Sequence, residues 1–345
     1  MRLPKTSVER RCIEVIATAV PEIVLGLWTL RGVEVVSDRS HGRTRVTEVR
    51  AHIVDHMTDC STTPALVLKH HPRVGGWAAD RAARLLRAAG MTGSPFAVAR
   101  TLGTSPCGTL VAESALGRPW ADYLVGEPLA ARGAAAVAHF LFDLQQAQAV
   151  LPIAPETQQE TDTHVLDLLK LASRRIPGAT EHLTELAERL DSALTSDVCA
   201  EPVPSHGDLH PRNVFLDPAQ TQLQYTPATV IDLDHTGMRE PAADIGYALC
   251  QVLVTAGHLG LDFEQSAQTA YRLWHAYREA DGLASDERIA VQTARAFVQV
   301  LHFEQVSVGG APIEALAFWA SVAARISRGG PQALGDPDVH EKEFR

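Results

Sequence analysis

The sequence changes its pattern at Pro119, and this change constrains the fold more than any other feature. Before Pro119, short segments rich in Val, Thr and Ile predict strands at 28–37, 44–54, 65–70, 95–102 and 107–114. Helical periodicity predicts helices at 7–19, 77–89, 128–149, 161–174, 179–195, 241–257, 262–281, 286–308 and 312–328. A strand-rich first third followed by helices predicts an α+β fold, and 345 residues are enough for two domains, which we place at 1–115 and 116–345.

The composition limits the classes of function that fit. Hydrophobic residues make up 46% of the chain, which is enough for a sizeable core. The formal net charge of −10 argues against nucleic-acid binding, and it either suits a cationic small partner or only keeps the protein in solution. The scattered cysteines predict neither a disulfide framework nor a zinc site, so we expect a reduced, cytoplasmic setting. Because no long apolar run exists, we expect no membrane segment, and both a monomer and a homodimer remain open.

One polar segment, 205–213 (SHGDLHPRN), concentrates groups that are capable of catalysis. It contains His206, Asp208 and Asn213, and an apolar strand is predicted directly after it, at 213–217. Polar side chains at the start of a buried strand stand at the edge of a core, where a cleft can form. The segment therefore predicts a catalytic loop.

A second apolar strand, predicted at 229–233, is associated with two acids, Asp232 and Asp234. Carboxylates in such a strand are costly unless a partner satisfies them, and a metal ion is one such partner. Carboxylate and amide oxygens are ligands that Mg²⁺ takes together with phosphate oxygens. Asn213 and Asp232 therefore predict a magnesium pair if the two strands form a hairpin. Asp208 is then left to orient a hydroxyl and accept its proton.

The order of these residues resembles the catalytic and metal-binding loops of protein-kinase-like phosphotransferases. The specific form, HGDLHPRN followed by Ile231-Asp232, is similar to the aminoglycoside phosphotransferase and choline kinase family. The segment 241–247 (PAADIGY) also matches that family, in which the aspartate, here Asp244, begins a helix and braces the catalytic loop. The resemblance implies a bilobal protein-kinase-like fold, with a small N-terminal antiparallel-sheet lobe and a larger, mainly helical C-terminal lobe.

The same resemblance implies that the N-terminal lobe binds the nucleotide. The segment 64–69 (PALVLK) resembles the strand whose lysine, here Lys69, contacts the nucleotide phosphates. In the family an acid of the next helix pairs with this lysine, and Asp80 is the candidate in the helix at 77–89.

Two further segments of the N-terminal lobe have counterparts in the family. Residues 37–44 occupy the place of the phosphate-covering hairpin, although Gly42 is their only glycine, and the sequence predicts a turn at 37–42. Residues 111–119 (VAESALGRP) resemble the hinge between lobes, whose backbone around Glu113 and Ala115 would hydrogen-bond a purine.

Several of these residues have a second interpretation. Lys69 also fits an ordinary surface lysine after a strand, and Asp80 a solvated helix acid. We expect His206 to form structural hydrogen bonds within the loop, whereas His210 either contacts the acceptor or caps the loop. Asp234 is either a second metal ligand or the partner of a backbone group.

Acidic residues of the C-terminal helices, where the family binds its acceptor, would present a negative surface to a cationic compound: Glu240, Glu279, Asp281 and Glu304.

The prediction for function is transfer of the γ-phosphoryl group of ATP or GTP, with Mg²⁺, to a hydroxyl of a small molecule. Lys69 would hold the phosphates, Asn213 and Asp232 the magnesium, and Asp208 the acceptor hydroxyl. We favour an antibiotic as the acceptor, so that phosphorylation confers resistance. A metabolic kinase of choline, homoserine or a sugar is the alternative with the same fold. A catalytically weak nucleotide-binding protein is the alternative from another class, which the glycine-poor hairpin favours.

Overall fold

The computed structural model describes residues 6–41, 44–70, 75–92, 96–126, 128–151, 158–194, 200–217, 227–305 and 311–335. The chain forms two compact units, the first from Met1–Gly93, Ala97–Leu116 and Thr229–Thr236, and the second from Ser94–Phe96, Gly117–Ala228 and Gly237–Arg345. The first unit thus includes a short segment from the middle of the chain, which carries Asp232 and Asp234.

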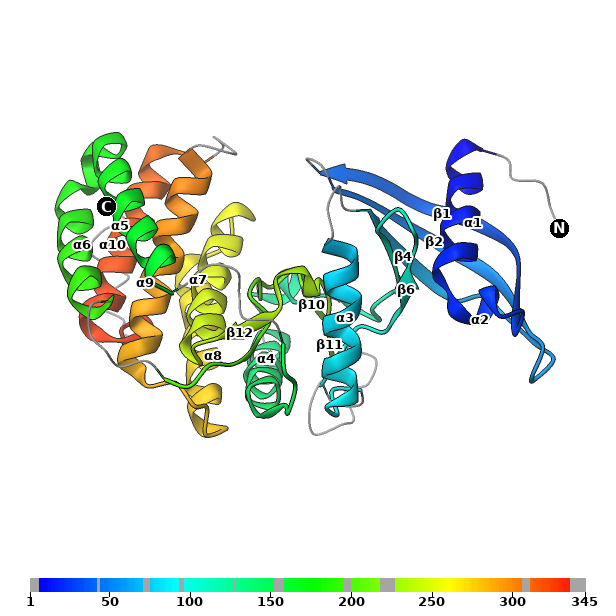
Figure 1. The fold of residues 1–345 in the computed structure, drawn as a ribbon. Coiled ribbons are helices and arrows are strands. Elements are labelled where there is room, and N and C mark those ends of the chain that lie inside the picture. The colour runs from blue at the N-terminus through cyan, green and yellow to red at the C-terminus, as the bar shows by residue number, and fades with distance from the viewer. Residues whose placement is uncertain are drawn as a thin grey trace. The chain divides into compact units, whose positions relative to one another are not determined.

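The first unit is built on an antiparallel sheet with the strand order β1–β2–β4–β7–β6, and β3 pairs with β2 (Figure 1). The strands are β1 (Trp28–His41), β2 (Thr44–Asp55), β3 (Cys60–Thr62), β4 (Ala65–His70), β6 (Thr101–Thr104) and β7 (Thr109–Glu113). The predicted turn at 37–42 is wrong, because β1 continues to His41 and pairs with β2 as far as Thr44. Pairing along a long hairpin here outweighs the turn preference of the Ser, Asp and Gly residues.

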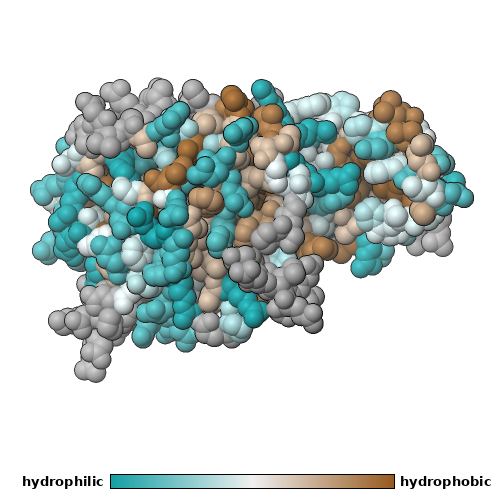
Figure 2. Space-filling model, turned by 90° about the horizontal axis from the view of Figure 1, so that it is seen from below, coloured by the Kyte–Doolittle hydropathy of each residue, from teal (hydrophilic) through white to brown (hydrophobic). Residues whose placement is uncertain are grey.

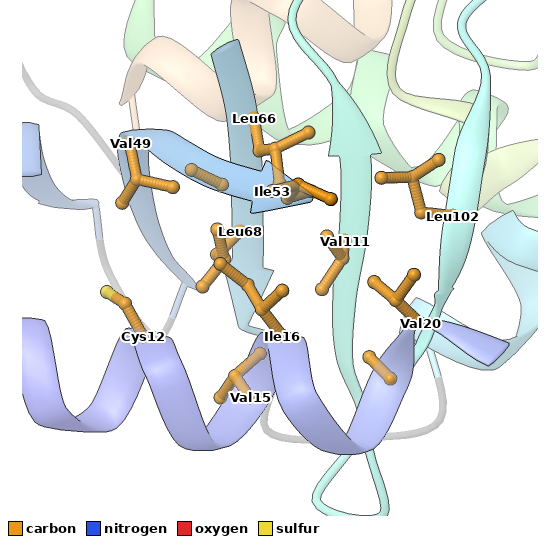
Figure 3. Packing of buried hydrophobic residues seen from close by; sticks show 12 residues of the cluster. Cys12, Val15, Ile16, Val20, Val49, Ile53, Leu66, Leu68, Leu102 and Val111 are labelled. Atoms are coloured by element: carbon orange, nitrogen blue, oxygen red, sulfur yellow. The ribbon is translucent and has the colours of Figure 1, made fainter. Parts of the chain in front are cut away.

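Helix α1 (Ser7–Ala19) covers one face of this sheet, and α3 (Gly75–Ala88) lies on the other (Figure 1). The helix α1 begins with a capping box, in which Thr6 and Glu9 bond each other's backbone N–H groups. Its apolar face packs on buried side chains of β2, β4, β6 and β7, some of which Figure 3 shows, and partly buried side chains of β1 join them. The short helix α2 (Pro21–Val24) follows directly.

The alternation of side chains along β4 separates these two faces. Leu66 and Leu68 are buried in the same cluster as Ile16 of α1 (Figure 3). Successive residues of a strand point to opposite faces of the sheet. Lys69 therefore points away from α1, on the other face of the sheet.

The second unit is mainly helical (Figure 1). Its helices are α4 (Leu129–Gln146), α5 (Gln158–Arg175), α6 (Thr180–Leu194), α7 (Ala242–His258), α8 (Phe263–Glu279), α9 (Asp286–Phe303) and α10 (Ile313–Gly329), in agreement with the prediction. Its short strands are β8 (Arg118–Pro119), which pairs with β10 (Val214–Leu216), and β9 (Val203–Ser205), which pairs with β12 (Gly237–Arg239). The sequence predicted only β10, because strands of two or three residues leave almost no periodic signal.

The strands β5 (Phe96–Val98) and β11 (Ala228–Val230) lie where the chain passes from one unit to the other. The predicted strand at 229–233 is too long, because β11 ends at Val230 and Leu233–His235 form a 3-10 helix. Residues 218–226, between the two short strands, lie outside the described residues.

Helices α7 and α9 pack closely because of one glycine. A Cβ atom on Gly246 would lie 2.7 Å from the backbone N of Thr293, so no larger residue fits there without a shift of α9. This contact fixes which face of α7 is turned toward the rest of the unit.

The surface of the protein is mixed, and Figure 2 shows teal and brown residues interspersed on one face. Exposed large hydrophobic side chains of the first unit include Val24, Leu25, Leu27 and Met57.

No helix in the described ranges has the length and apolar character that crossing a membrane requires. Cys12, Cys60, Cys107 and Cys250 are free thiols.

Candidate active site

The loop 205–213 is held to the start of α7 by one carboxylate. The carboxylate of Asp244 accepts hydrogen bonds from the backbone N of His206 at 2.6 Å and of Gly207 at 2.9 Å. Both Asp244 and His206 are buried, so these charge-assisted bonds are shielded from water. Gly207 has a φ of 80°, a conformation that glycine adopts without strain. Asp244 thus braces the loop through its backbone.

Within the loop, His206 and His210 each accept a backbone hydrogen bond at Nδ1. The Nδ1 atom of His206 accepts from the backbone N of Asp208 at 3.2 Å, and Nδ1 of His210 accepts from the backbone N of Arg212 at 3.2 Å. A backbone N–H can only donate, so both Nδ1 atoms are unprotonated in this arrangement. Both rings therefore stabilise turns of the loop as hydrogen-bond acceptors.

Asn213 closes the loop. Its side-chain Nδ2 donates to the carbonyl of Asp208 at 3.0 Å, and its backbone N donates to the carbonyl of His210 at 2.8 Å. Because the NH₂ group is used in this way, Oδ1 is the side-chain atom that can bind a cation. The loop geometry thus orients the amide oxygen and fixes the backbone at Asp208 together.

Among the described residues, the carboxylate of Asp208 has one close partner, Tyr247 of α7. The hydroxyl of Tyr247 donates to Oδ1 of Asp208 at 2.8 Å, and Nε2 of His210 lies 3.9 Å from Oδ2. Burial, and after it the negative charge of Asp208, raises the pKa of Tyr247 well above its usual value. Tyr247 therefore remains a neutral donor over the whole physiological range of pH.

In the first unit, Lys69 pairs with both acids of the segment 229–236. Its Nζ atom forms a short contact with Oδ1 of Asp232 and lies 2.8 Å from Oδ2 of Asp234. The Lys69 side chain is only 16% exposed. Burial lowers the pKa of Lys69, but the two carboxylates outweigh this effect, so the net pKa is raised and the lysine stays charged. Two acids and one lysine leave the cluster with a net negative charge.

Asp232 has an unusual backbone conformation. Its φ and ψ of 66° and 62° lie in the left-handed region, which few residues other than glycine adopt. This conformation ends the extended chain after β11 and begins the 3-10 helix, so Asp232 and Asp234 both reach Lys69. Strained backbone of this kind is often found at functional sites.

Asp80 is bonded elsewhere than to Lys69. Its carboxylate accepts from Nε of Arg84 at 3.1 and 3.0 Å and from the hydroxyl of Thr101 at 2.5 Å. Arg84 lies one helical turn after Asp80 on α3, where an ion pair forms at little entropic cost. Asp80 and Lys69 are therefore not paired with each other here.

The hinge candidates lie at the end of β7. The backbone N of Glu113 donates to the carbonyl of Arg100 at 2.9 Å, and the two side chains form an ion pair at 2.8 Å. The backbone N of Ser114 donates to the carbonyl of Ala65 at 2.9 Å. Ala115 follows this last sheet contact and is partly exposed. This geometry is compatible with a purine contact, which remains a prediction.

The hairpin of β1 and β2 places a second cation on the face of Lys69. Arg39 is directly opposite Val46, and Val46 is directly opposite Lys69 on β4. Residues directly opposite in antiparallel strands point to the same face. Arg39 is 71% exposed at its side chain and forms an ion pair of 2.7 Å with Glu48. Arg39 and Lys69 therefore lie in one row on one face of the sheet.

The donors of these clusters fit magnesium better than a transition metal. No group of three or more His, Cys, Asp or Glu side chains within the described ranges is arranged to hold a metal ion. Asn213 and Asp232 offer only oxygen atoms, and Mg²⁺ is commonly bound by one or two such groups, with water and phosphate oxygens as the other ligands.

The acids expected to face a cationic acceptor differ in exposure. Glu240 forms an ion pair with Arg288 at 2.6 Å, and buried Glu304 contacts Nε2 of His258 at 3.2 Å. Glu279 is 70% exposed at its side chain. Glu240 is thus paired with an arginine and Glu304 is buried against a histidine, whereas Glu279, which lies 3.4 Å from Nδ1 of His275, is the more accessible acid.

Two cavities of the described residues lie apart from these clusters. A cavity of about 750 Å³ in the second unit is lined by α6, α9 and α10, and one of about 160 Å³ in the first unit lies on the α1 face of the sheet. Neither cavity is lined by Lys69, Asp208 or Asp232. Hydrogen-bond geometry identifies the candidate site better than cavity size does.

Sequence reasoning assigned no role to Tyr247 or Arg39. Tyr247 lies three residues after Asp244, a spacing that places both side chains on the same face of a helix, and this signal was present in the sequence. The position of Arg39 depends on the register of the hairpin, which the sequence alone does not give.

The model of the phosphotransferase enzyme family matches residues 59–290, which is more than half of the chain. No curated protein sequence matches the chain.

Solved structures with the same fold include three antibiotic phosphotransferases. A macrolide 2'-phosphotransferase from Brachybacterium faecium is 17% identical, with a TM-score of 0.51 over 88% of this chain and 96% of its own. A spectinomycin phosphotransferase with bound ADP and spectinomycin is 10% identical, with a TM-score of 0.57 over 94% and 98%. An aminoglycoside 2'-phosphotransferase with bound GDP is 14% identical, with a TM-score of 0.52 over 86% and 93%. These similarities confirm the expected α+β, protein-kinase-like fold.

Proposed function

Because the chain belongs to the phosphotransferase enzyme family, we propose that it transfers the γ-phosphoryl group of ATP or GTP to a hydroxyl of a small molecule. The observation that carries this proposal is the arrangement of Asp208. Its backbone lies in a loop that Asp244 and Asn213 fix, and its carboxylate is oriented by Tyr247. A fixed carboxylate at the edge of the core can orient a hydroxyl and accept its proton.

In the proposed reaction, the acceptor oxygen forms a bond to the γ-phosphorus while the bond from that phosphorus to the bridging oxygen breaks. The hydroxyl proton passes to the carboxylate of Asp208, and the nucleoside diphosphate leaves. Such transition states are loose, so positioning and charge neutralisation supply most of the rate enhancement.

Lys69, Asn213 and Asp232 would act on the nucleotide. Lys69 is a buried, charged ammonium that can bind phosphate oxygens, and Asn213 and Asp232 would hold Mg²⁺. When bound, the magnesium ion neutralises charge on the phosphates. Asp232 would offer a carboxylate oxygen to the metal, while the ammonium of Lys69 would bind the phosphates.

Arg39 would supply some of the phosphate contacts that the backbone of a glycine-rich loop would otherwise make. The hairpin has few glycines whose backbone N–H groups could approach phosphates closely. An exposed guanidinium in the same row as Lys69 offers up to two parallel hydrogen bonds to a phosphate instead. This interpretation weakens the case for a catalytically weak nucleotide-binding protein, which rested on the poor glycine content.

For the acceptor we propose an antibiotic, whose inactivation would confer resistance. The support is that three structures of the same fold are named as phosphotransferases of macrolides, spectinomycin and aminoglycosides. Exposed Glu279 and the formal charge of −10 favour a cationic compound. A metabolic kinase for choline, homoserine or a sugar is the alternative. We place the enzyme in the cytoplasm, where its nucleotide is available and where free thiols persist.

The test is a nucleotide-consumption assay with Mg²⁺ and either ATP or GTP across a panel of antibiotics and metabolites. We expect one class of acceptor to gain the mass of one phosphate, and Asp208→Asn to abolish this gain while nucleotide binding persists. If no acceptor increases consumption above the rate of Asp208→Asn, the proposed function is wrong.

A further inference from the structure

Tyr247 is the only residue in the described ranges that hydrogen-bonds the carboxylate of Asp208. Its hydroxyl lies 2.8 Å from Oδ1, whereas the next polar group, Nε2 of His210, lies 3.9 Å from Oδ2, which is too far for a hydrogen bond. The two oxygens of this carboxylate are therefore not equivalent.

We propose that Tyr247 is a positioning residue that fixes the rotation of the Asp208 carboxylate, so that Oδ2 is the oxygen that receives the acceptor proton. This inference rests on the proposed function and deepens it. Rotation of an aspartate carboxylate about its last torsion is broad and nearly two-fold. A single donor on Oδ1 removes that freedom and leaves the lone pairs of Oδ2 for the acceptor hydroxyl.

The position of Tyr247 is itself fixed by the packing of α7. Asp244 and Tyr247 are three residues apart on one face of this helix, so both side chains point to the loop. Gly246 between them brings α7 against Thr293 of α9, where a Cβ atom would lie 2.7 Å from the backbone N. One helix face thus holds the backbone of the loop through Asp244 and its reactive carboxylate through Tyr247.

The tyrosine does not compete with Asp208 for the proton. Burial and the adjacent carboxylate raise the pKa of Tyr247, so it remains protonated throughout the working range. Its contribution is therefore orientation, and its loss should lower kcat without changing how the nucleotide binds.

The experiment compares Tyr247→Phe with Tyr277→Phe. Each change removes one tyrosine hydroxyl from a helix of the second unit and keeps the ring. The hydroxyl of Tyr277 donates to Oε1 of Gln145 at 2.8 Å and accepts from the backbone N of Ala284 at 3.2 Å. It makes no contact with Asp208 and controls for the loss of a buried hydrogen bond.

The assay is Mg²⁺-dependent release of inorganic phosphate from ATP and from GTP, with water as the acceptor, so that it requires no identified antibiotic. We expect Tyr247→Phe to lower kcat about tenfold at a nucleotide KM within twofold of the wild type. Tyr277→Phe should lower the melting temperature and leave kcat within twofold.

A double variant distinguishes positioning from general damage. If Tyr247 acts through Asp208, then adding Tyr247→Phe to Asp208→Asn should leave the residual rate unchanged, because the two effects are coupled. The inference is overturned if kcat of Tyr247→Phe stays within twofold of the wild type, or if the double variant is tenfold slower than Asp208→Asn. If wild type and Asp208→Asn release phosphate equally slowly even with the acceptor panel, the proposed function fails and this inference with it.

Discussion

The two clusters of candidate site residues are held by different forces. In the second unit, the loop 205–213 is fixed by hydrogen bonds from its backbone N–H groups to buried Asp244 and to the imidazole of His206. In the first unit, Lys69 and the acids of the segment 229–236 are held by mutual ion pairs. The loop is therefore held by hydrogen bonds within the second unit, whereas the charged groups of the ion-pair cluster are the ones that would bind a metal and phosphates. Substitutions should accordingly affect turnover in the loop and ligand affinity in the cluster.

The largest effect is expected at Asp208, whose carboxylate is oriented by Tyr247. Asp208→Asn keeps the shape of the side chain but removes its ability to accept a proton. We expect kcat to fall by about 10²- to 10⁴-fold, the typical contribution of general acid–base catalysis, with nucleotide affinity within a few fold of the wild type. Steady-state kinetics together with calorimetric titration of nucleotide would measure both. If nucleotide affinity fell by as much as kcat, the loop would contribute to nucleotide binding as well as to turnover, and the proposed division of roles would be wrong.

These residues also show how far the sequence alone could predict the site. Asp208, Asn213 and Asp244 lie within a short stretch of the chain whose spacing is itself the signal, and the structure brings Asp244 onto the loop. The contact between Lys69 and Asp232 spans 163 positions, so it depends on the fold and leaves no periodic trace. The predicted turn at 37–42 failed for a similar reason, because cross-strand pairing in a long hairpin outweighed local preferences.

The second-largest effect is expected at Asp232, a residue of the ion-pair cluster, which we expect to bind ligands. Asp232→Asn removes a charge that binds magnesium in the proposed site, and Lys69 keeps Asp234 as its partner. We expect the apparent affinity for Mg²⁺ to fall by about tenfold or more, with partial recovery of activity at high magnesium. Titration of activity with MgCl₂ measures this change, and addition of EDTA should abolish the activity of the wild type. A loss of kcat that saturating magnesium does not restore would contradict the assignment.

Substitution of Lys69 should affect both binding and stability. Lys69→Met keeps the length of the side chain but leaves two largely buried carboxylates without their ammonium. Removal of one partner of such a cluster costs about 3–5 kcal/mol at most, and less where water reaches the remaining charge. We expect a lower melting temperature that recovers on addition of Mg²⁺, because the metal replaces the missing charge. The same variant without this recovery would indicate that the acids do not bind the metal.

A smaller effect is expected at Arg39 in the hairpin. Arg39→Ala should raise the KM for ATP or GTP about fivefold, because an exposed contact to a phosphate contributes about 1 kcal/mol. The affinity for the nucleoside without phosphates should not change. Arg50→Ala is the matched control, since Arg50 is another exposed arginine of the same hairpin, 3.9 Å from Glu34 and far from the row of Lys69. Equal effects of the two substitutions would show a general change of charge rather than a phosphate contact.

The smallest effect concerns pH and the other face of the same hairpin. A hydrogen bond from Arg45, together with one from Thr47, lowers the pKa of Asp38 to about 2. Since the folded pKa lies below the usual value of a carboxyl group, the stabilisation is present above about pH 4 and is lost as the pH falls toward 2. The side chain is 24% exposed, so solvent screening limits the effect to about 1 kcal/mol or less. Chemical denaturation at pH 5 and at pH 3 should therefore show a larger loss of stability for the wild type than for Asp38→Asn. Equal losses would mean that the pair of Asp38 and Arg45 does not stabilise the first unit, and that the packing of its sheet against α1 holds this part of the hairpin.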